Sequence, residues 1–193
     1  MSAVLNRANR VFGMLAFAFI MVFGAASFAG QAQAAQTGTP HLLIQLKGGT
    51  VDIELLPKLA PKQVAQIIAL TDKGFYNGIV FHRVIDGFMA QTGDPTGTGM
   101  GHSDLPDVPA EFSPEPYVRG IVGAARAQDP DSANSQFFIM LADNDSLNGK
   151  YTVFGRVVSG MEFVDAIKKG DPANNGMVTD PDKMISAKIE YRN

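Results

Sequence analysis

From His41 onward, most apolar residues of this chain fall in short runs separated by glycine, proline and polar residues. The first two runs cover 41–46 and 51–55, and the Lys-Gly-Gly-Thr sequence between them has the composition of a hairpin turn. Within 51–55, apolar and acidic residues alternate, which is the period of a strand buried on one face. The pattern therefore predicts an antiparallel hairpin at the start of the globular part.

Two other stretches have the spacing of helices. The first, 61–73, begins with a proline, repeats apolar residues every three or four positions, and is followed by a glycine suited to a C-terminal cap. We expect Lys73 in its last turn, where the positive charge would complement the helix dipole. The second stretch, 161–169, ends before Gly170.

The remaining apolar runs are too short for helices and predict further strands. Twenty glycines and eleven prolines are spread along the chain, which favours many turns. Strands and helices do not alternate regularly, so we expect one mainly β domain built as a closed or nearly closed antiparallel barrel. The strands expected after the first hairpin are 79–85, 88–92, 121–125, 137–141, 151–158 and 183–192.

The N-terminus has the layout of a secretory signal peptide. Arg7 and Arg10 precede an almost wholly apolar stretch, 11–28, and Ala-Gln-Ala at 32–34 offers a cleavage site. We interpret 1–34 as a signal peptide, 35–40 as a linker and 41–193 as the functional domain of a periplasmic protein. The alternative is an uncleaved membrane anchor, because about 18 apolar residues are near the lower limit for spanning a bilayer.

Charge and composition narrow the range of partners and chemistries. Cleavage after Ala34 would remove two arginines and no acidic residues, changing the formal charge from −3 to −5. This balance does not favour nucleic acid or anionic lipid as a partner. The chain has no cysteine and only three, scattered histidines, so we expect no metal and no cofactor. Glycine-rich 97–101 is interpreted as a flexible surface turn, and 143–149 lacks the ligands of a calcium loop.

The most informative segment is 81–94, two short strand-like runs joined at Asp86–Gly87. It places Arg83 among large apolar residues and one amide, Gln91. A guanidinium is a permanent donor and not an acid or base. The arrangement therefore suits binding or polarising a neutral group, such as an amide, on an apolar platform.

Two later segments extend this pattern. Ala-Ala-Arg-Ala at 124–127 is followed by Ser-Ala-Asn-Ser-Gln-Phe-Phe-Ile at 132–139, and 147–157 reads Leu-Asn-Gly-Lys-Tyr-Thr-Val-Phe-Gly-Arg-Val. With these three motifs in order, the chain resembles the cyclophilin family of peptidyl-prolyl cis–trans isomerases, in its bacterial single-domain form. The resemblance implies an eight-stranded antiparallel barrel with an α-helix closing each end, and proline-containing polypeptides as substrates.

The resemblance also implies the roles of individual residues. Arg83 matches the catalytic arginine, and Gln91 matches the glutamine that binds the substrate carbonyl and helps to position the arginine. Tyr151 stands where many eukaryotic members have histidine. The remaining positions match residues that bind the substrate: Phe88, Met89, Phe138 and Leu147 in the proline pocket, and Ala125, Arg126, Ala127 and Gln136 in the neighbouring groove.

Two functions follow from this resemblance. The first is an isomerase that accelerates the folding of secreted proteins, acting without a covalent step. The second is a chaperone module that binds proline-containing peptides and in which turnover is incidental. Nothing in the sequence indicates an oligomerisation surface, so a monomer is expected.

Several of these residues also have a structural interpretation. An isolated arginine in a strand is more often a surface residue, and Met89 could fill a gap in the core. Because adjacent residues of a strand face opposite sides, we assign Phe137 to the core and Phe138 to the pocket. His82 is expected to be a buried structural histidine. Ser146 stands where cyclosporin-sensitive members have tryptophan, so weak cyclosporin inhibition is expected.

Overall fold

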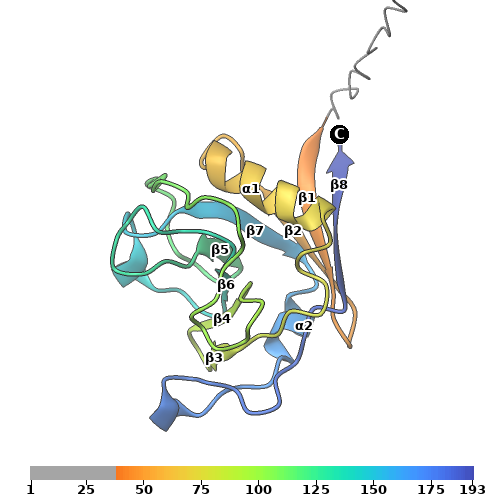
Figure 1. The fold of residues 1–193 in the computed structure, drawn as a ribbon, viewed down its shortest axis with the longest axis vertical. Helices are drawn as coiled ribbons and strands as arrows, with labels where there is room; N and C mark the ends of the chain where they lie inside the picture. The colour runs from red at the N-terminus through yellow and green to blue at the C-terminus, as the bar shows by residue number, and fades with distance from the viewer. Residues whose placement is uncertain (1–37) are drawn as a thin grey trace, which may run out of the picture. The chain divides into compact units, whose positions relative to one another are not determined.

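The computed structural model describes residues 38–193, a mainly β fold with two helices (Figure 1). The predicted signal peptide and the first half of the linker, 35–37, lie outside the described residues. Two 3₁₀ turns, η1 and η2, lie in the second half of the chain. The elements are β1 Thr39–Gln45, β2 Thr50–Leu55, α1 Pro61–Asp72, β3 Arg83–Ile85, β4 Met89–Thr92, β5 Ile121–Ala124, β6 Phe137–Met140, η1 Asp145–Leu147, β7 Val153–Ser159, α2 Met161–Asp165, η2 Pro172–Asn174 and β8 Ser186–Arg192.

All eight strands form one antiparallel sheet in the order β3-β4-β6-β5-β7-β2-β1-β8. The predicted hairpin is β1–β2, and β8 runs beside β1 (Figure 1). The prediction of a closed barrel is wrong, because β3 and β8 do not pair. Strand β3 has three residues, and the backbone of Gly176 occupies its free edge by accepting a hydrogen bond from Val84 N at 2.8 Å.

Some predicted elements are shorter than the sequence pattern indicated. In 79–85, only Arg83–Ile85 is a strand, and the preceding residues meet 182–184 through hydrogen bonds such as Phe81 N to Asp182 O at 2.8 Å. Helix α2 ends at Asp165. Lys73 is the C-cap of α1 and not part of its last turn, so that detail of the prediction is wrong.

The main hydrophobic core lies between the sheet and α1. Val64, Ile67 and Leu70 of α1 are buried in it together with apolar side chains of β1 and β2. Phe137 has no exposed surface and contacts Phe154 edge to face, with ring centroids 6.0 Å apart, as assigned from the strand alternation. Within residues 38–193, no helix combines the length and apolar character required to cross a membrane.

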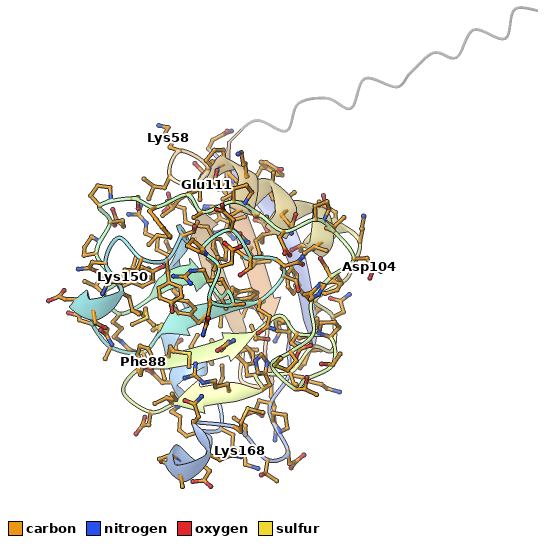
Figure 2. The ribbon with its side chains drawn as sticks, turned by 60° about the vertical axis from the view of Figure 1, so that its left-hand side comes forward. Lys58, Phe88, Asp104, Glu111, Lys150 and Lys168 are labelled. Carbon is orange, nitrogen blue, oxygen red and sulfur yellow. The ribbon has the colours of Figure 1, made fainter. Side chains whose placement is uncertain are left out.

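A distant carboxylate caps the N-terminus of α1. The N-cap residue, Ala60, has no side chain able to accept a hydrogen bond. Glu111 fills this role instead, since its two carboxylate oxygens accept hydrogen bonds from Lys62 N at 3.0 Å and Gln63 N at 2.9 Å. Glu111 lies beside α1 in Figure 2. The carboxylate therefore ties the loop before β5 to the helix. The N–H of Glu111 donates to Thr152 Oγ1 at 2.9 Å, which holds the same loop to the residue before β7.

We predict that Glu111→Ala lowers the free energy of unfolding by about 1 kcal/mol, as loss of a helix cap does. Chemical denaturation at neutral pH would measure this change. Glu115→Ala is the matched control, because the Glu115 carboxylate has no hydrogen-bond partner among the described residues. Equal effects of the two substitutions would show that the cap contributes nothing.

Candidate active site

Arg83 and Gln91 face each other across the β3–β4 hairpin. They are directly paired in the strand register, so their side chains lie on the same face of the sheet. Arg83 Nη1 donates a hydrogen bond to Gln91 Oε1 at 3.1 Å. The pairing continues across the sheet, because Gln91 is opposite Phe138 of β6, and Phe138 is opposite Gly123 of β5. One transverse row thus carries the cation, the amide and an aromatic ring.

Position 123 in this row must be glycine, because other side chains occupy the place of a Cβ atom. A Cβ atom at position 123 would lie 2.5 Å from the Tyr117 hydroxyl and 2.6 Å from the Phe138 ring. The two rings stack with centroids 5.7 Å apart, and both belong to a small apolar cluster distinct from the main core. The missing side chain of Gly123 therefore leaves room for the Phe138 ring and the Tyr117 hydroxyl.

Arg83 is also held from the side opposite Gln91. Its Nε donates to the backbone oxygen of Asn175 at 2.9 Å, and its Nη2 donates to Asn175 Oδ1 at 2.9 Å. Partial burial lowers the pKa of the Arg83 guanidinium, which nonetheless stays charged. Asn175 was missed from the sequence because it lies 92 residues from Arg83. The Asn175–Gly176 dipeptide was the one available signal, since it is typical of a tight turn.

A pocket of about 190 Å³, lined by apolar side chains together with Gln91 and Arg126, opens beside Arg83. Phe88, in the turn between β3 and β4 (Figure 2), lines this pocket. Tyr151 meets Phe138 edge to face, with ring centroids 5.8 Å apart. Among the described residues that line it, none has a carboxylate or an imidazole. Nine residues predicted from the sequence are brought together here: Arg83, Phe88, Met89, Gln91, Ala125, Arg126, Phe138, Leu147 and Tyr151.

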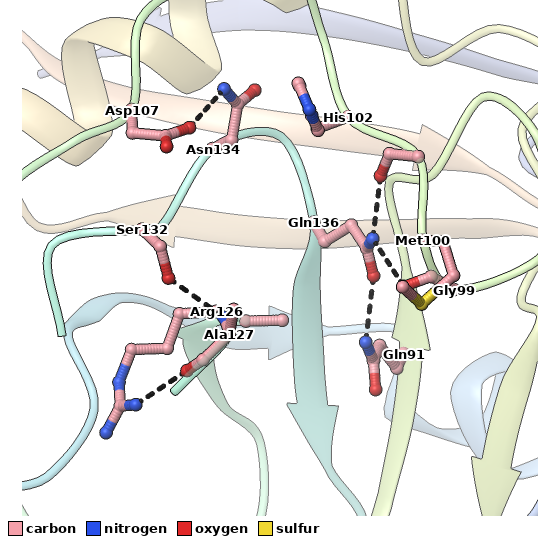
Figure 3. Close-up of a pocket in the computed structure, with 12 residues that line it drawn as sticks. Gln91, Gly99, Met100, His102, Asp107, Arg126, Ala127, Ser132, Asn134 and Gln136 are labelled. Carbon is pink, nitrogen blue, oxygen red and sulfur yellow. Dashed lines mark hydrogen bonds between the residues drawn. The ribbon is translucent and has the colours of Figure 1, made fainter. Parts of the chain in front are cut away.

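The two remaining predicted residues, Ala127 and Gln136, line an adjoining pocket of about 330 Å³ (Figure 3). Gln136 links this pocket to the first. Its Oε1 accepts a hydrogen bond from Gln91 Nε2 at 2.9 Å, and its Nε2 donates to the backbone oxygens of Gly99 at 3.1 Å and Gly101 at 2.8 Å. A chain of hydrogen bonds therefore runs from the glycine-rich loop to Arg83.

The glycine-rich loop is more than the surface turn inferred from the sequence, since Gly99, Met100 and Gly101 line the adjoining pocket. Asp94 holds it in place. This carboxylate is 1% exposed and accepts hydrogen bonds from Thr96 N at 2.7 Å and Gly99 N at 2.6 Å. Burial alone would raise the pKa of Asp94, but these hydrogen bonds outweigh it and lower the pKa to about 2.

Arg126 lines both pockets. Its guanidinium lies 4.5 Å from the centre of the Tyr151 ring, a distance typical of a cation–π contact. It also donates to the backbone oxygens of Ala127 at 2.9 Å and Lys150 at 3.0 Å. Ala125 and Arg126 line both pockets, and Ala127 continues this segment into the larger one.

His82, next to Arg83, is buried as predicted. It is 1% exposed, and neither ring nitrogen has a hydrogen-bond partner among the described residues. Burial lowers the pKa of His82, although the nearby Asp94 carboxylate opposes this shift and Arg83 reinforces it. The ring is therefore neutral at pH 7. Residues 38–193 contain no cluster of three or more histidine, aspartate or glutamate side chains that could hold a metal ion.

We predict that His82 makes folding sensitive to mild acid. Its pKa is lower in the folded than in the unfolded chain, so the unfolded chain takes up the proton more readily. The stability from the neutral ring is present above about pH 6.5 and is lost as the pH falls below it. Chemical denaturation would measure the free energy of unfolding at several pH values between 7.5 and 5. Over this range it should fall more in the wild type than in His82→Phe.

His102→Gln is the control for this experiment, because His102 is exposed. Its pH dependence should match that of the wild type. A His82→Phe protein with the full wild-type loss of stability would contradict the assignment.

Comparisons with known proteins agree on one family. The family model described as "Cyclophilin type peptidyl-prolyl cis-trans isomerase/CLD" matches residues 41–189. A Brucella suis protein named "Probable peptidyl-prolyl cis-trans isomerase" is 56% identical, over 83% of this chain and 89% of its own. "Peptidyl-prolyl cis-trans isomerase-like 1" of Aspergillus fumigatus is 38% identical, over 73% of this chain and 89% of its own.

A solved structure is similar to the described fold. It is a cyclophilin-type peptidyl-prolyl cis-trans isomerase of Cryptosporidium parvum, crystallised in the presence of the dipeptide Ala-Pro. The TM-score is 0.72 at 31% sequence identity, and the match covers 79% of this chain and 99% of the other.

Proposed function

The chain belongs to the cyclophilin family of peptidyl-prolyl cis–trans isomerases, and on this basis we propose that Arg83 drives a non-covalent rotation of X-Pro bonds. One observation carries the proposal. The Arg83 guanidinium has five N–H donors, and three of them are committed to Gln91 and Asn175. Two are left for a substrate beside the apolar side chains of the pocket.

The reaction requires a donor more than an acid or a base. An X-Pro bond is held planar by amide resonance, with a rotation barrier of roughly 18–20 kcal/mol. Twisting the bond removes the conjugation and leaves a lone pair on the proline nitrogen. A hydrogen bond from Arg83 to this nitrogen stabilises the twisted state more than either planar state. Lowering the barrier by about 7 kcal/mol would accelerate rotation on the order of 10⁵-fold.

The two pockets suit the two sides of the rotating bond. We place the proline ring against Phe88, Met89, Phe138 and Leu147, where the pocket is apolar. Gln91 has one amide hydrogen left after its bond to Gln136, and that hydrogen is available to the substrate carbonyl. Residues before the proline would then lie along 125–127 toward the adjoining pocket. The Ala-Pro dipeptide used with the Cryptosporidium parvum protein supports proline-containing peptides as substrates.

We predict that Arg83→Ala lowers kcat/KM for an X-Pro peptide by at least about 10²-fold, the typical effect of removing a donor to the transition state. Arg83→Lys should recover little, because an ammonium on a flexible stem cannot make the same three oriented bonds. A protease-coupled assay with a chromogenic peptide measures the rates. Arg156→Ala is the control, since that arginine pairs with Glu54 outside both pockets. Wild-type rates in Arg83→Ala would refute the mechanism.

The competing function is a chaperone module in which turnover is incidental. The two proposals differ in what Arg83→Ala does to the refolding of a protein limited by proline isomerisation. An isomerase loses its acceleration in this variant, whereas a module that acts by binding keeps it. The three committed N–H donors of Arg83 favour the isomerase, because binding an apolar ring alone does not require an oriented cation.

We further propose that the protein is a periplasmic monomer that accelerates the folding of secreted proteins. Support comes from the sequence of 1–34, with two arginines, an apolar stretch and Ala-Gln-Ala before Ala35. N-terminal sequencing of the protein from its native cells should give a mature chain starting at Ala35. A chain that keeps the apolar stretch would instead support a membrane-anchored enzyme.

A further inference from the structure

Arg83 lies between two supports that come from opposite edges of β3. On one edge, β4 brings Gln91 to Nη1. On the other edge, the segment 170–177 brings Asn175, which accepts from Nε through its backbone oxygen and from Nη2 through Oδ1, both at 2.9 Å. The Asn175 bonds engage one side of the planar guanidinium, and the Gln91 bond engages another nitrogen. Together they define the plane in which the remaining N–H groups point.

The segment 170–177 is itself fixed against β3. Val84 N donates to Gly176 O, and Gly170 N donates to Val84 O, both at 2.8 Å. Position 170 must be glycine, because a Cβ there would collide with the backbone of Gly176. Asn175 has φ +51°, a left-handed conformation that asparagine adopts more readily than most residues. The Asn175 side chain is therefore presented to Arg83 by a backbone that β3 holds in register.

We propose that Asn175 is a positioning residue for the isomerase reaction, acting through Arg83 and without contact with the substrate. The inference rests on the proposed role of Arg83 as the donor to the proline nitrogen. A long, flexible arginine in a partly solvated pocket would sample many rotamers, and small displacements of a catalytic group cost large factors in rate. Asn175 and Gln91 share this task, so losing the Asn175 side chain leaves Arg83 present and charged but poorly aimed.

A purely structural role is the competing explanation, since asparagine is common at left-handed turn positions. Asn175→Gly separates the two roles. Glycine accepts a positive φ without strain and retains the backbone oxygen that binds Arg83 Nε, but it removes the Oδ1 acceptor. Asn175→Asp keeps an acceptor at the same place and also tolerates the left-handed conformation. Asn174→Gly is the control, because the exposed neighbouring side chain has no hydrogen bond in the described structure.

The test is the kinetics of these variants with an X-Pro peptide, with thermal unfolding measured in parallel. We expect Asn175→Gly to lower kcat about tenfold, as the loss of a hydrogen bond to a charged group does, with KM within about twofold of the wild type. Asn175→Asp should recover kcat to within about threefold. Asn174→Gly should match the wild type. An unchanged kcat in Asn175→Gly, or a loss seen mainly in KM, would overturn the proposal.

A double-mutant cycle with Arg83→Ala decides whether Asn175 acts through the arginine. If it does, adding Asn175→Gly to Arg83→Ala should change the residual rate less than twofold. A further tenfold loss would show an independent, structural effect and overturn the proposal. The cycle also separates the two hypotheses: an Arg83→Ala protein with wild-type turnover refutes the role of Arg83, whereas a large loss there with no effect of Asn175→Gly refutes the positioning role alone.

Discussion

The register of four antiparallel strands is the constraint on which the site depends. It sets Arg83, Gln91, Phe138 and Gly123 in one row across β3, β4, β6 and β5. Side chains alternate between faces along a strand, so a slip of one residue would turn any of them toward the other face. Gly123 ends the row, and because it has no side chain, the Phe138 ring can lie beside its backbone. Strand pairing therefore builds the platform, and loops complete the rest of the site.

The proposed chemistry follows from holding a permanent cation beside apolar side chains. A charge in such surroundings is costly unless its donors are satisfied, and the structure commits three of the five N–H groups of Arg83. The acceptors are amides of Gln91 and Asn175 and carry no charge. They orient the guanidinium without neutralising it, so in the proposed mechanism its positive charge stays available to a developing lone pair.

The sequence predicted the parts of the site that are close in the chain or carried by recognisable motifs. Arg83 and Gln91 are joined by one short turn, and the alternation in β6 correctly separated Phe137 from Phe138. It missed what depends on distant backbone contacts. Asn175 reaches Arg83 from 92 residues away, and the Gly99–Gly101 loop lines a pocket only because Asp94 and Gln136 hold it. The pairing of the two edge strands, β3 and β8, would also be a contact between distant parts of the chain, and the sequence wrongly predicted that they would close a barrel.

The most direct test measures a proline peptide while it is bound, by NMR exchange between its cis and trans forms on the wild-type and Arg83→Ala proteins. The account predicts that Arg83→Ala binds both forms with affinities close to those of the wild type, whereas their interconversion on the protein slows by at least about 10²-fold. If the interconversion rate persisted and the affinities fell instead, Arg83 would be a binding residue, and stabilisation of the twisted bond would have another source.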